Sequence, residues 1–385
     1  MHSKGIYSRI GILGGGQLGK MLAQAAADWN LDITVLDPVR NAPASCCAKQ
    51  VLGDFRNYDD VMAFGADKDV LTIEIEDVSL EALTRLEQMG KAVYPSPASL
   101  ALIQDKGSQK QFYADHQLPT APFKIIDNPS EVTGLIAGGA IQFPFVQKLR
   151  KAGYDGRGVQ VINDPSQLNQ LFQAHSVIEQ KVAIRHEIAV LTSRNTLGEI
   201  KVYDPVDMIF HPTANLLLRQ DSPANLDQTL LSKAMDLATR LIKQMDIVGL
   251  LAVEMFVDKA DQILINEVAP RPHNSGHHTI EASITSQYHQ HLRCILGLPL
   301  GATDSTGYSS LINLLGEPGH TGPAHYTGMA AALALPGVYI HLYGKKETKP
   351  FRKMGHVTIV GRDKITVSES ELYLSQHLKV ITQTQ

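Results

Sequence analysis

Two glutamates in the middle of the chain are spaced so that they face each other. Apolar stretches on either side of a short turn at residues 259–261 predict two adjoining strands. Antiparallel pairing about that turn places Glu254 opposite Glu267 and Phe256 opposite Ile265. Directly opposite residues share a face of the sheet, with Cβ atoms about 4.5–5.5 Å apart. The two carboxylates are therefore predicted to lie in one small space.

Such a pair of carboxylates is a candidate site for a divalent cation. Like charges at this distance repel each other unless a positive charge lies between them. The oxygens of Glu254, Glu267 and the neighbouring Asn266 suit Mg²⁺, which completes its octahedron with waters and substrate phosphates. Two alternatives stay open: the carboxylates splay into solvent, or Arg271 neutralises them.

A dense polar segment follows the second predicted strand. It runs from residue 267 to residue 276 and contains Arg271, His273 and Asn274. Arginine presents a rigid fork that suits a carboxylate, bicarbonate or phosphate. The segment is therefore a candidate anion site, against the alternative of a solvated loop in which Arg271 only pairs with a neighbouring acid. The adjacent His277 and His278 lack a partner at metal spacing, so no zinc site is predicted.

A glycine-rich turn near the N-terminus could bind a phosphate group. Residues 14–19 match G-x-G-x-x-G between a predicted strand and a predicted helix, and Asp37 follows at about the spacing of a ribose-binding acid. This pattern favours NAD. The N–H groups at the start of a helix would hold a phosphorylated substrate equally well, and a tight turn that binds nothing is the third alternative.

A second glycine-rich loop occupies residues 153–158 and follows a predicted strand that carries Lys148. Such a loop can fold its backbone donors over phosphates, with the lysine as a point charge. A plain hairpin turn fits the same residues.

The elements that must position these residues indicate three domains of the α/β and α+β classes. Alternating strands and helices over residues 1–98 predict a parallel sheet covered on both faces. Residues 99–300 form the second domain, with a small α+β lid at about 120–182, and residues 301–385 a small β-rich third domain. We expect helices at residues 18–27, 100–116, 164–173, 227–245 and 286–297, and late strands at 311–315, 339–343, 356–360 and 378–381.

Composition limits the classes of function. The 385 residues have 35 Lys and Arg against 39 Asp and Glu, for a net charge of −4. This balance does not favour nucleic-acid binding. No stretch approaches the roughly 18 apolar residues of a membrane span, and three cysteines form neither a disulfide framework nor a metal spacing. We therefore expect no nucleic-acid and no membrane partner, and a reducing, cytoplasmic location.

Taken together, the motifs resemble the ATP-grasp superfamily and, within it, the N5-carboxyaminoimidazole ribonucleotide synthetases of purine biosynthesis. Four segments support the resemblance, at residues 14–21, 153–158, 266–277 and 352–356, and the third is highly specific. The resemblance implies an ATP-grasp fold with an N-terminal Rossmann-like pre-ATP-grasp domain and a small C-terminal domain. It also implies a homodimer.

The implied reaction is the ATP-dependent carboxylation of 5-aminoimidazole ribonucleotide with bicarbonate. Carboxyphosphate, or CO₂ released from it, would carboxylate the amine and leave ADP and phosphate. By resemblance, Mg²⁺, with Mn²⁺ as the alternative, would be held by Glu254 and Glu267. The glycine turn at residues 14–19 would then receive the ribonucleotide instead of NAD.

The resemblance also assigns roles to individual residues. ATP, as co-substrate, would be bound by Lys106, Lys148, Gly153, Tyr154, Asp155, Gly156, Arg157, Gly158, Val159, Glu179, Gln180, Lys181, Val182, Glu187, His211, Asn266 and Glu267. The ribonucleotide would be bound by Gly16, Gln17, Leu18, Glu76, Lys345, Arg352 and Lys353. The residues around bicarbonate and the aminoimidazole would be Tyr154, Asp155, Arg157, Arg271, His273 and Asn274.

Three other functions compete with this one. Another ATP-grasp ligase, such as the formate-dependent glycinamide ribonucleotide transformylase or a biotin carboxylase, shares the core, but residues 271–276 favour the synthetase. An NAD-dependent oxidoreductase would explain the first glycine turn and leave Glu254, Glu267 and Arg271 unexplained. A non-catalytic nucleotide-binding regulator would not need the carboxylate pair.

Overall fold

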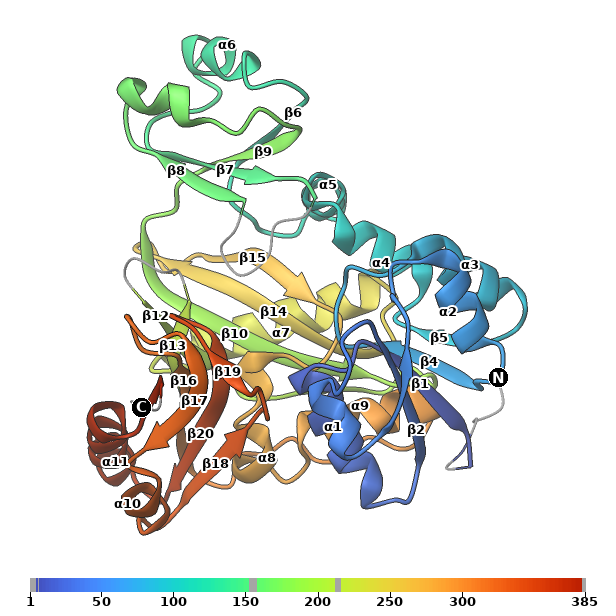
Figure 1. Ribbon diagram of the computed structural model, residues 1–385. Helices are drawn as coiled ribbons and strands as arrows, with labels where there is room; N and C mark the ends of the chain where they lie inside the picture. The colour runs from blue at the N-terminus through green and yellow to red at the C-terminus, as the bar shows by residue number, and fades with distance from the viewer. Residues whose placement is uncertain (1–4, 6, 152–157, 212–215, 383–385) are drawn as a thin grey trace.

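The computed structural model describes residues 5, 7–151, 158–211 and 216–382. Figure 1 shows a small unit standing above a larger body, in which a nine-stranded sheet lies beside a smaller parallel sheet. Among the described residues no helix is long and apolar enough to cross a membrane. Residues 152–157 and 212–215 lie outside the described part of the chain, and the first range includes the predicted site residues Gly153, Tyr154, Asp155, Gly156 and Arg157.

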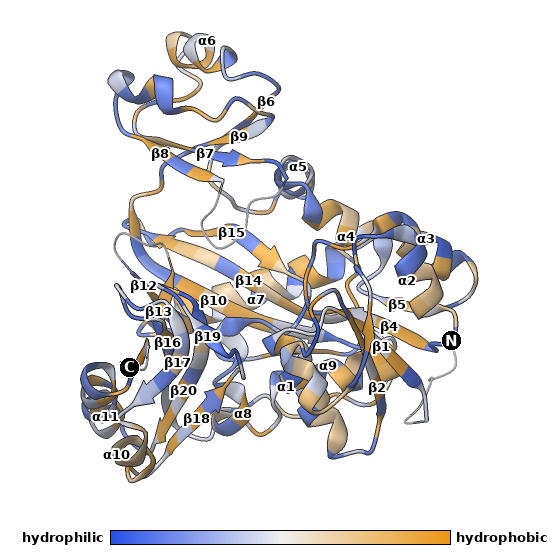
Figure 2. Cartoon of the chain, viewed as in Figure 1, coloured by the Kyte–Doolittle hydropathy of each residue, from blue (hydrophilic) through white to orange (hydrophobic). Residues whose placement is uncertain are grey.

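The N-terminal unit is the parallel α/β sheet that the alternation of strands and helices predicts. Its order is β3-β2-β1-β4-β5, built from β1 (Arg9–Leu13), β2 (Asp32–Asp37), β3 (Lys49–Leu52), β4 (Val70–Ile73) and β5 (Ala92–Tyr94). Helices α1 (Gln17–Ala27), α2 (Tyr58–Gly65) and α3 (Leu80–Gln88) connect the strands. The four residues of β4 are all buried, as expected for a strand covered on both faces. Figure 2 shows hydrophobic residues along this sheet and hydrophilic ones on the outer helices.

The larger sheet has the order β15-β14-β10-β12-β13-β16-β20-β18, with β11 (Ile200–Val202) beside β10. Besides β11, five of its strands belong to the predicted second domain: β10 (Ile184–Arg194), β12 (Val206–Phe210), β13 (Leu217–Ser222), β14 (Gly249–Asp258) and β15 (Ile263–Ala269). Helix α7 (Gln228–Gln244) packs on this sheet through the largest apolar core of the described residues. Helix α9 (Gln287–Leu296) packs against both β14 and α1 and so joins the two sheets.

The small upper unit in Figure 1 is a four-stranded antiparallel sheet. Its order is β6-β9-β7-β8, from β6 (Phe123–Ile126), β7 (Phe145–Leu149), β8 (Val159–Ile162) and β9 (Ser176–Gln180), with α6 (Glu131–Ala137) packed on it. The predicted helix at 164–173 is instead a 3-10 turn, Pro165–Gln170, in which no residue is buried. A segment with no buried face lacks the packing that stabilises a short α-helix.

The C-terminal strands are divided between two sheets. Strands β16 (Tyr308–Leu315), β20 (Lys353–Gly361) and β18 (Val338–Leu342) extend the nine-stranded sheet through the pairing of β13 with β16. A second, three-stranded sheet has the order β19-β17-β21, from β17 (Gly322–Thr327), β19 (Glu347–Thr348) and β21 (Lys379–Thr382). The predicted boundary at residues 300 and 301 therefore falls within a chain segment whose two sides share one sheet.

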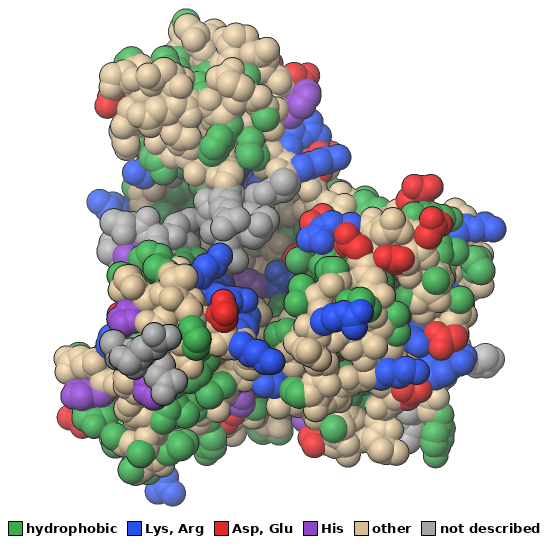
Figure 3. Space-filling view, in the orientation of Figure 1, with side chains coloured by type: hydrophobic (Ala, Val, Ile, Leu, Met, Phe, Trp, Pro, Cys, Tyr) green, Lys and Arg blue, Asp and Glu red, His purple; other side chains and the backbone are tan. Residues whose placement is uncertain are grey.

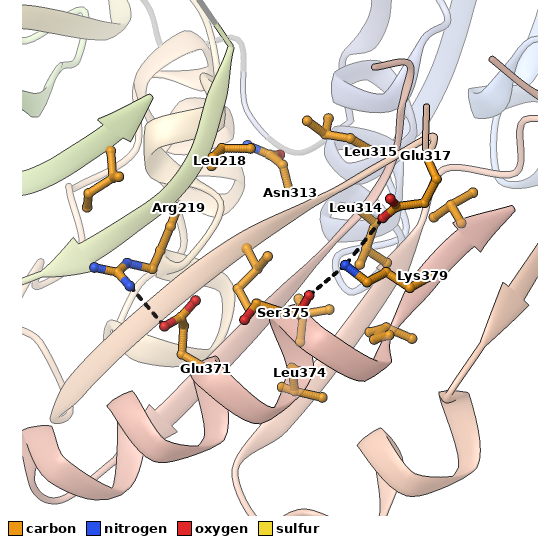
Figure 4. Close-up of a pocket in the computed structure, with 15 residues that line it drawn as sticks. Leu218, Arg219, Asn313, Leu314, Leu315, Glu317, Glu371, Leu374, Ser375 and Lys379 are labelled. Carbon is orange, nitrogen blue, oxygen red and sulfur yellow. Dashed lines mark hydrogen bonds and ion pairs between the residues drawn. The ribbon is translucent and has the colours of Figure 1, made fainter. Parts of the chain in front are cut away.

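A helix in this region escaped prediction. Helix α11 (Lys364–His377) buries only Val367 and Leu374, seven residues apart, so its apolar periodicity is weak. Its start is fixed by Asp363, which accepts a hydrogen bond from the N–H of Thr366. Beneath α11 lies a mainly apolar cavity of about 330 Å³, shown in Figure 4, with the ion pair of Arg219 and Glu371 among its walls.

Candidate active site

The two predicted glutamates face each other in one cleft. Glu254 on β14 pairs directly with Glu267 on β15, as the hairpin register predicts. The prediction for Phe256 was wrong by one residue: a bulge after Glu254 makes Asn266 the extra residue, and Phe256 faces Leu264. A bulge re-aims side chains locally, so it turns Asn266 toward the same cleft, where its Oδ1 accepts a hydrogen bond from Lys148 Nζ at 2.8 Å.

The electrostatics of the pair are asymmetric. Lys106 Nζ lies 2.7 Å from Glu267 Oε2, and its charge lowers the pKa of Glu267. Burial, followed by the negative charge of Glu267, raises the pKa of Glu254. The Glu267 side chain is 45% exposed and that of Glu254 17% exposed, so both can still be reached. Two carboxylates and an amide oxygen suit Mg²⁺ chemically, since Mg²⁺ takes few protein ligands. Among the described residues no group of three or more His, Cys, Asp or Glu is placed so that it could hold a metal ion.

Helix α5 (Lys106–Asp115) brings lysines to these carboxylates. It begins at Asp105, whose carboxylate accepts from the N–H groups of Gly107 and Ser108 and pairs with Arg150 at 2.8 Å. Lys106 and Lys110, one turn apart, therefore face the same side. Lys110 was not among the predicted site residues, although its spacing of four residues from Lys106 indicated that both lie on one side of a helix.

A buried ion network extends behind the cleft. The carboxylate of Glu179 lies 3.2 Å from Lys110 Nζ and 3.1 Å from Lys148 Nζ, and its side chain is 4% exposed. Burial would raise the pKa of Glu179, but the charges of Lys148 and Lys110 outweigh it and lower that pKa. Burial lowers the pKa of Lys110 to about 8. The structure thus commits the Glu179 side chain to two lysines, and its predicted contact with ATP stays a prediction.

The Arg271 segment joins the two large units. Arg271 Nε lies 2.9 Å from Glu76 Oε1, so the guanidinium pairs with a residue predicted to bind the ribonucleotide. His273 Nε2 lies 3.7 Å from Glu254 Oε1, which places this loop next to the carboxylate pair. Glu76 follows β4 and does not lie on it, because the strand ends at Ile73.

The first glycine turn is filled by the protein itself. The carboxylate of Glu74 accepts hydrogen bonds from the N–H groups of Gly16 and Gly19 at 2.6 and 2.7 Å. A Cβ at Gly16 would lie 2.5 Å from the Glu74 oxygen, which explains why glycine is needed there. Asp37 is buried and accepts from the N–H of Gly15 at 2.8 Å and of Val39 at 2.8 Å, so its role is structural. The prediction of a dinucleotide ribose at Asp37 is therefore wrong.

The C-terminal basic residues approach the cleft from the other side. The charge of Lys353 acts on Glu254 and partly opposes the rise of its pKa that burial causes. Lys345 Nζ donates to the Lys353 carbonyl at 2.8 Å. Arg352 instead donates to the Glu347 carbonyl at 2.8 Å. His211 packs edge-on against Phe351 at 5.4 Å between ring centroids, next to Arg352. Figure 3 shows Lys and Arg side chains gathered around the hollow in this face.

Three family models match consecutive parts of the chain. They describe a ribonucleotide synthetase preATP-grasp domain at residues 7–104, an ATP-grasp domain at 111–288 and a phosphoribosylaminoimidazole carboxylase C-terminal domain at 309–370. The N5-carboxyaminoimidazole ribonucleotide synthase of Bacillus subtilis is 34% identical over 357 residues, covering 91% of this chain and 91% of that protein. The chain belongs to this family of synthases.

Solved structures of N5-carboxyaminoimidazole ribonucleotide synthases share the fold. The enzyme from Thermotoga maritima has a TM-score of 0.89 and 37% identity, over 98% of this chain and 100% of that one. The Aspergillus clavatus synthase, solved with ADP and 5-aminoimidazole ribonucleotide, has a TM-score of 0.84 and 30% identity, over 96% and 97%. The phosphoribosylaminoimidazole carboxylase of Vigna aconitifolia is 36% identical, and the chain spans 65% of its length.

Seen as a member of this family, the chain brings several predicted residues into one cleft and leaves others apart. Lys106, Lys148, Glu254, Asn266, Glu267 and His273 converge there. Gln180 does not point freely into the cleft, because its amide bonds to the backbone of Gln142 and Pro144. Glu187 lies beside β14 opposite Phe256, where burial raises its pKa. Gly158 and Val159 close the β7–β8 hairpin.

Proposed function

We propose that the protein carboxylates 5-aminoimidazole ribonucleotide with bicarbonate at the expense of ATP, giving N5-carboxyaminoimidazole ribonucleotide, ADP and phosphate in purine biosynthesis. The observation that supports this best is the cleft at β14 and β15, where Glu254 and Glu267 face each other beside Lys106 and Lys148. This arrangement combines a divalent-cation site with phosphate-binding cations. The names of the synthases that share the fold support the choice of nucleotide.

The chemistry requires two transfers. In the first, a bicarbonate oxygen bonds to the γ-phosphorus of ATP while the bond from that phosphorus to ADP breaks. In the second, the amine nitrogen bonds to the carboxyl carbon of carboxyphosphate, or of CO₂ released from it, while phosphate leaves and the amine loses a proton. Carboxyphosphate reacts with water, so the site must exclude water between the two steps.

The described residues fit distinct parts of this chemistry. Lys106 and Lys148, which donate to Glu267 and Asn266, would donate to phosphate oxygens when ATP is bound. Mg²⁺, or Mn²⁺, bound to Glu254 and Glu267 would neutralise charge on the transferred phosphoryl group. Arg271 offers its guanidinium fork to bicarbonate or a carboxylate, with Glu76 fixing the arginine.

Assembly and location follow from the family resemblance alone. We include in the proposal a homodimer and a location in the cytoplasm. The remaining predicted ATP contacts among the described residues are Gly158, Val159, Glu179, Gln180, Lys181, Val182, Glu187 and His211, and the predicted ribonucleotide contacts are Gly16, Gln17, Leu18, Glu76, Lys345, Arg352 and Lys353.

The test is ADP release from Mg-ATP and bicarbonate, with and without 5-aminoimidazole ribonucleotide. We expect strong stimulation by this nucleotide and none by glycinamide ribonucleotide with formate. Stimulation by the second pair only would replace the proposal with the formate-dependent ligase. ADP release that ignores both nucleotides would refute the substrate assignment.

A further inference from the structure

A row of polar side chains on the C-terminal strands docks against the segment that follows Arg271. Asn313 on β16, His356 on β20 and His341 on β18 are direct cross-strand neighbours. Each meets one residue from η3 (Asn274–Gly276) and α8 (Thr279–Ala282) or the turn between them. The pairs are Asn313 with Asn274 at 3.0 Å, His356 with His277 at 4.7 Å between ring centroids, and His341 with Glu281 at 2.6 Å.

The spacing of these contacts shows that the docking is specific. Residues 274, 277 and 281 are three and four apart, so one face of a helical segment meets one row of the sheet. Asn313 and His356 are buried, as is His277. Buried polar groups of this kind are hydrogen-bonded or costly, so each pair constrains how the loop is oriented.

The orientation of the Asn313 amide follows from a backbone contact. One of its side-chain atoms lies 2.9 Å from the carbonyl oxygen of Leu217, and only the amide nitrogen can donate there. The other atom is therefore the oxygen, and it lies 3.0 Å from the Asn274 side chain. Asn274 must then present its nitrogen to Asn313. Asn313 and the next residue in the strand, Leu314, both line the cavity beneath α11 (Figure 4).

This chain of contacts leaves Asn274 Oδ1 as an acceptor. That oxygen is buried and has no hydrogen-bond partner among the described residues. An amide oxygen accepts from N–H and O–H donors and repels anions. It therefore suits the amine or another donor of a nucleotide base better than it suits ATP phosphates or bicarbonate.

The backbone around Asn274 is held separately. Gln287, at the start of α9, accepts from the N–H of His273 at 2.8 Å and donates to the carbonyl of the same residue at 2.9 Å. Gln220 donates to the Ser275 carbonyl at 2.9 Å. These bonds fix the backbone of His273 and Ser275 on either side of Asn274. The Asn274 side-chain amide can still rotate, and its hydrogen bond to Asn313 limits that rotation.

We propose that Asn313 is a positioning residue of the active site, which fixes the Asn274 amide so that Oδ1 accepts from a donor group of the ribonucleotide. The role in substrate selection rests on the proposed function. The fixing of the amide does not, and it can be measured without any substrate.

The first experiment follows the Asn274 side chain by NMR in protein labelled with ¹⁵N-asparagine, its signal being assigned by loss in Asn274→Ala. We expect slow exchange of one Asn274 amide proton in the wild type, loss of that protection in Asn313→Leu, and partial retention in Asn313→Asp, which still offers an acceptor to Asn274 but loses the donor to the Leu217 carbonyl. Thr358→Val is the matched control. Thr358 is buried on the same face of β20 as His356, the cross-strand neighbour of Asn313, and its Oγ1 has no hydrogen-bond partner among the described residues. Unchanged exchange in Asn313→Leu would overturn the proposal.

The second experiment measures steady-state kinetics of the same variants, with circular dichroism to confirm folding. We expect KM for 5-aminoimidazole ribonucleotide to rise about tenfold in Asn313→Leu, the value of one hydrogen bond, while KM for ATP stays constant. Asn313→Asp should recover part of the loss, because it keeps the acceptor for Asn274, and Thr358→Val should match the wild type. The selective role would be overturned if KM for 5-aminoimidazole ribonucleotide rose equally in all three variants. It would also be overturned if KM for ATP rose as much as KM for the ribonucleotide in Asn313→Leu. A wild type that does not respond to the nucleotide refutes the proposed function, and amide exchange still decides whether Asn313 fixes Asn274.

Discussion

The negative charge of buried or half-buried carboxylates is stabilised by different groups at two sites of the molecule. Glu74 sits at the start of α1, where two backbone N–H groups donate to it. Glu254 and Glu267 face a cleft in which lysine side chains supply the positive charge. The first site is closed, because the glycine cradle is already filled by the protein. The second is open, because its carboxylates meet side chains instead of backbone groups and the Glu267 side chain is 45% exposed.

This difference shows why a phosphate-binding motif can mislead. A helix N-terminus attracts any anion, and a carboxylate of the same chain is always present at high effective concentration. The G-x-G-x-x-G pattern therefore marks a place for an anion without saying whose anion it is. At the carboxylate pair the positive charge comes from a side chain, Lys106, which can change its partner when a ligand binds.

The largest effect should come from breaking the open site. Replacing Glu267 by Gln removes one charge of the cation site, and ADP release should fall about 10²–10³-fold, as when one electrostatic partner of a reacting group is lost. The melting temperature should change little, because the side chain is 45% exposed. Glu317→Gln, which alters a glutamate paired with Lys379, is the control and should keep full activity. A near-normal rate in Glu267→Gln would refute the cation assignment.

The arginine beside the open site is the next test. Arg271 Nε lies 2.9 Å from Glu76 Oε1. The substitution Arg271→Lys keeps the positive charge but removes the bidentate fork of the guanidinium. We expect kcat/KM to fall roughly 10- to 100-fold, the value of a charge-assisted hydrogen bond. Arg219→Lys, at the ion pair with Glu371, serves as the matched control. If Arg271→Lys turns over normally, the guanidinium does not bind the substrate anion.

The closed site should respond in stability. Glu74→Gln leaves one of the N–H groups of Gly16 and Gly19 without an acceptor or facing an NH₂ group. The free energy of unfolding should fall by about 1–3 kcal/mol, measured by urea denaturation. Glu74→Gln could instead unfold like the wild type and lose as much activity as Glu267→Gln. Glu74 would then belong to an open site, and the contrast between the two carboxylate sites would be wrong.

The smallest effect concerns the support of β4, the strand that leads to Glu74. His291 Nε2 bonds to Thr72 Oγ1 at 2.9 Å, and burial lowers the pKa of His291 to about 4. The unfolded histidine titrates near 6.5, so the unfolded state takes up a proton that the folded state refuses. Stability is therefore complete above pH 6.5 and falls as the pH drops toward 4, by about 1.4 kcal/mol per pH unit for each such group.

The test compares the free energy of unfolding at pH 7, 6 and 5 in the wild type and in His291→Gln. Glutamine can keep the bond to Thr72 and does not titrate, so its slope below pH 6.5 should be shallower by about one proton. Burial also lowers the pKa of His278 to about 4, so a slope remains in the variant. Identical slopes would show that His291 is accessible to protons in the folded protein.

Features with a short period in the sequence were predictable. The pairing of Glu254 with Glu267 depends on a turn a few residues away, and the bulge at Asn266 shifted only the residues on its other side. The helix spanning residues 227–245 was expected and found as α7, because an N-cap at Asp227 and a strong apolar stripe both lie within the segment. Helix α11 was missed because only Val367 and Leu374 face the core.

The sequence by itself determined the α/β order of the N-terminal unit, the carboxylate hairpin and the polar segment around Arg271. Only the tertiary structure decided that Glu74 fills the glycine turn, that Arg271 meets Glu76 and that Asn313 orients Asn274. The reason is physical. Hydrogen-bond patterns within a helix or hairpin repeat every few residues and leave a periodic trace, whereas contacts between distant segments depend on the order in which strands join a sheet. That order is set by the packing of whole units, and no local spacing records it.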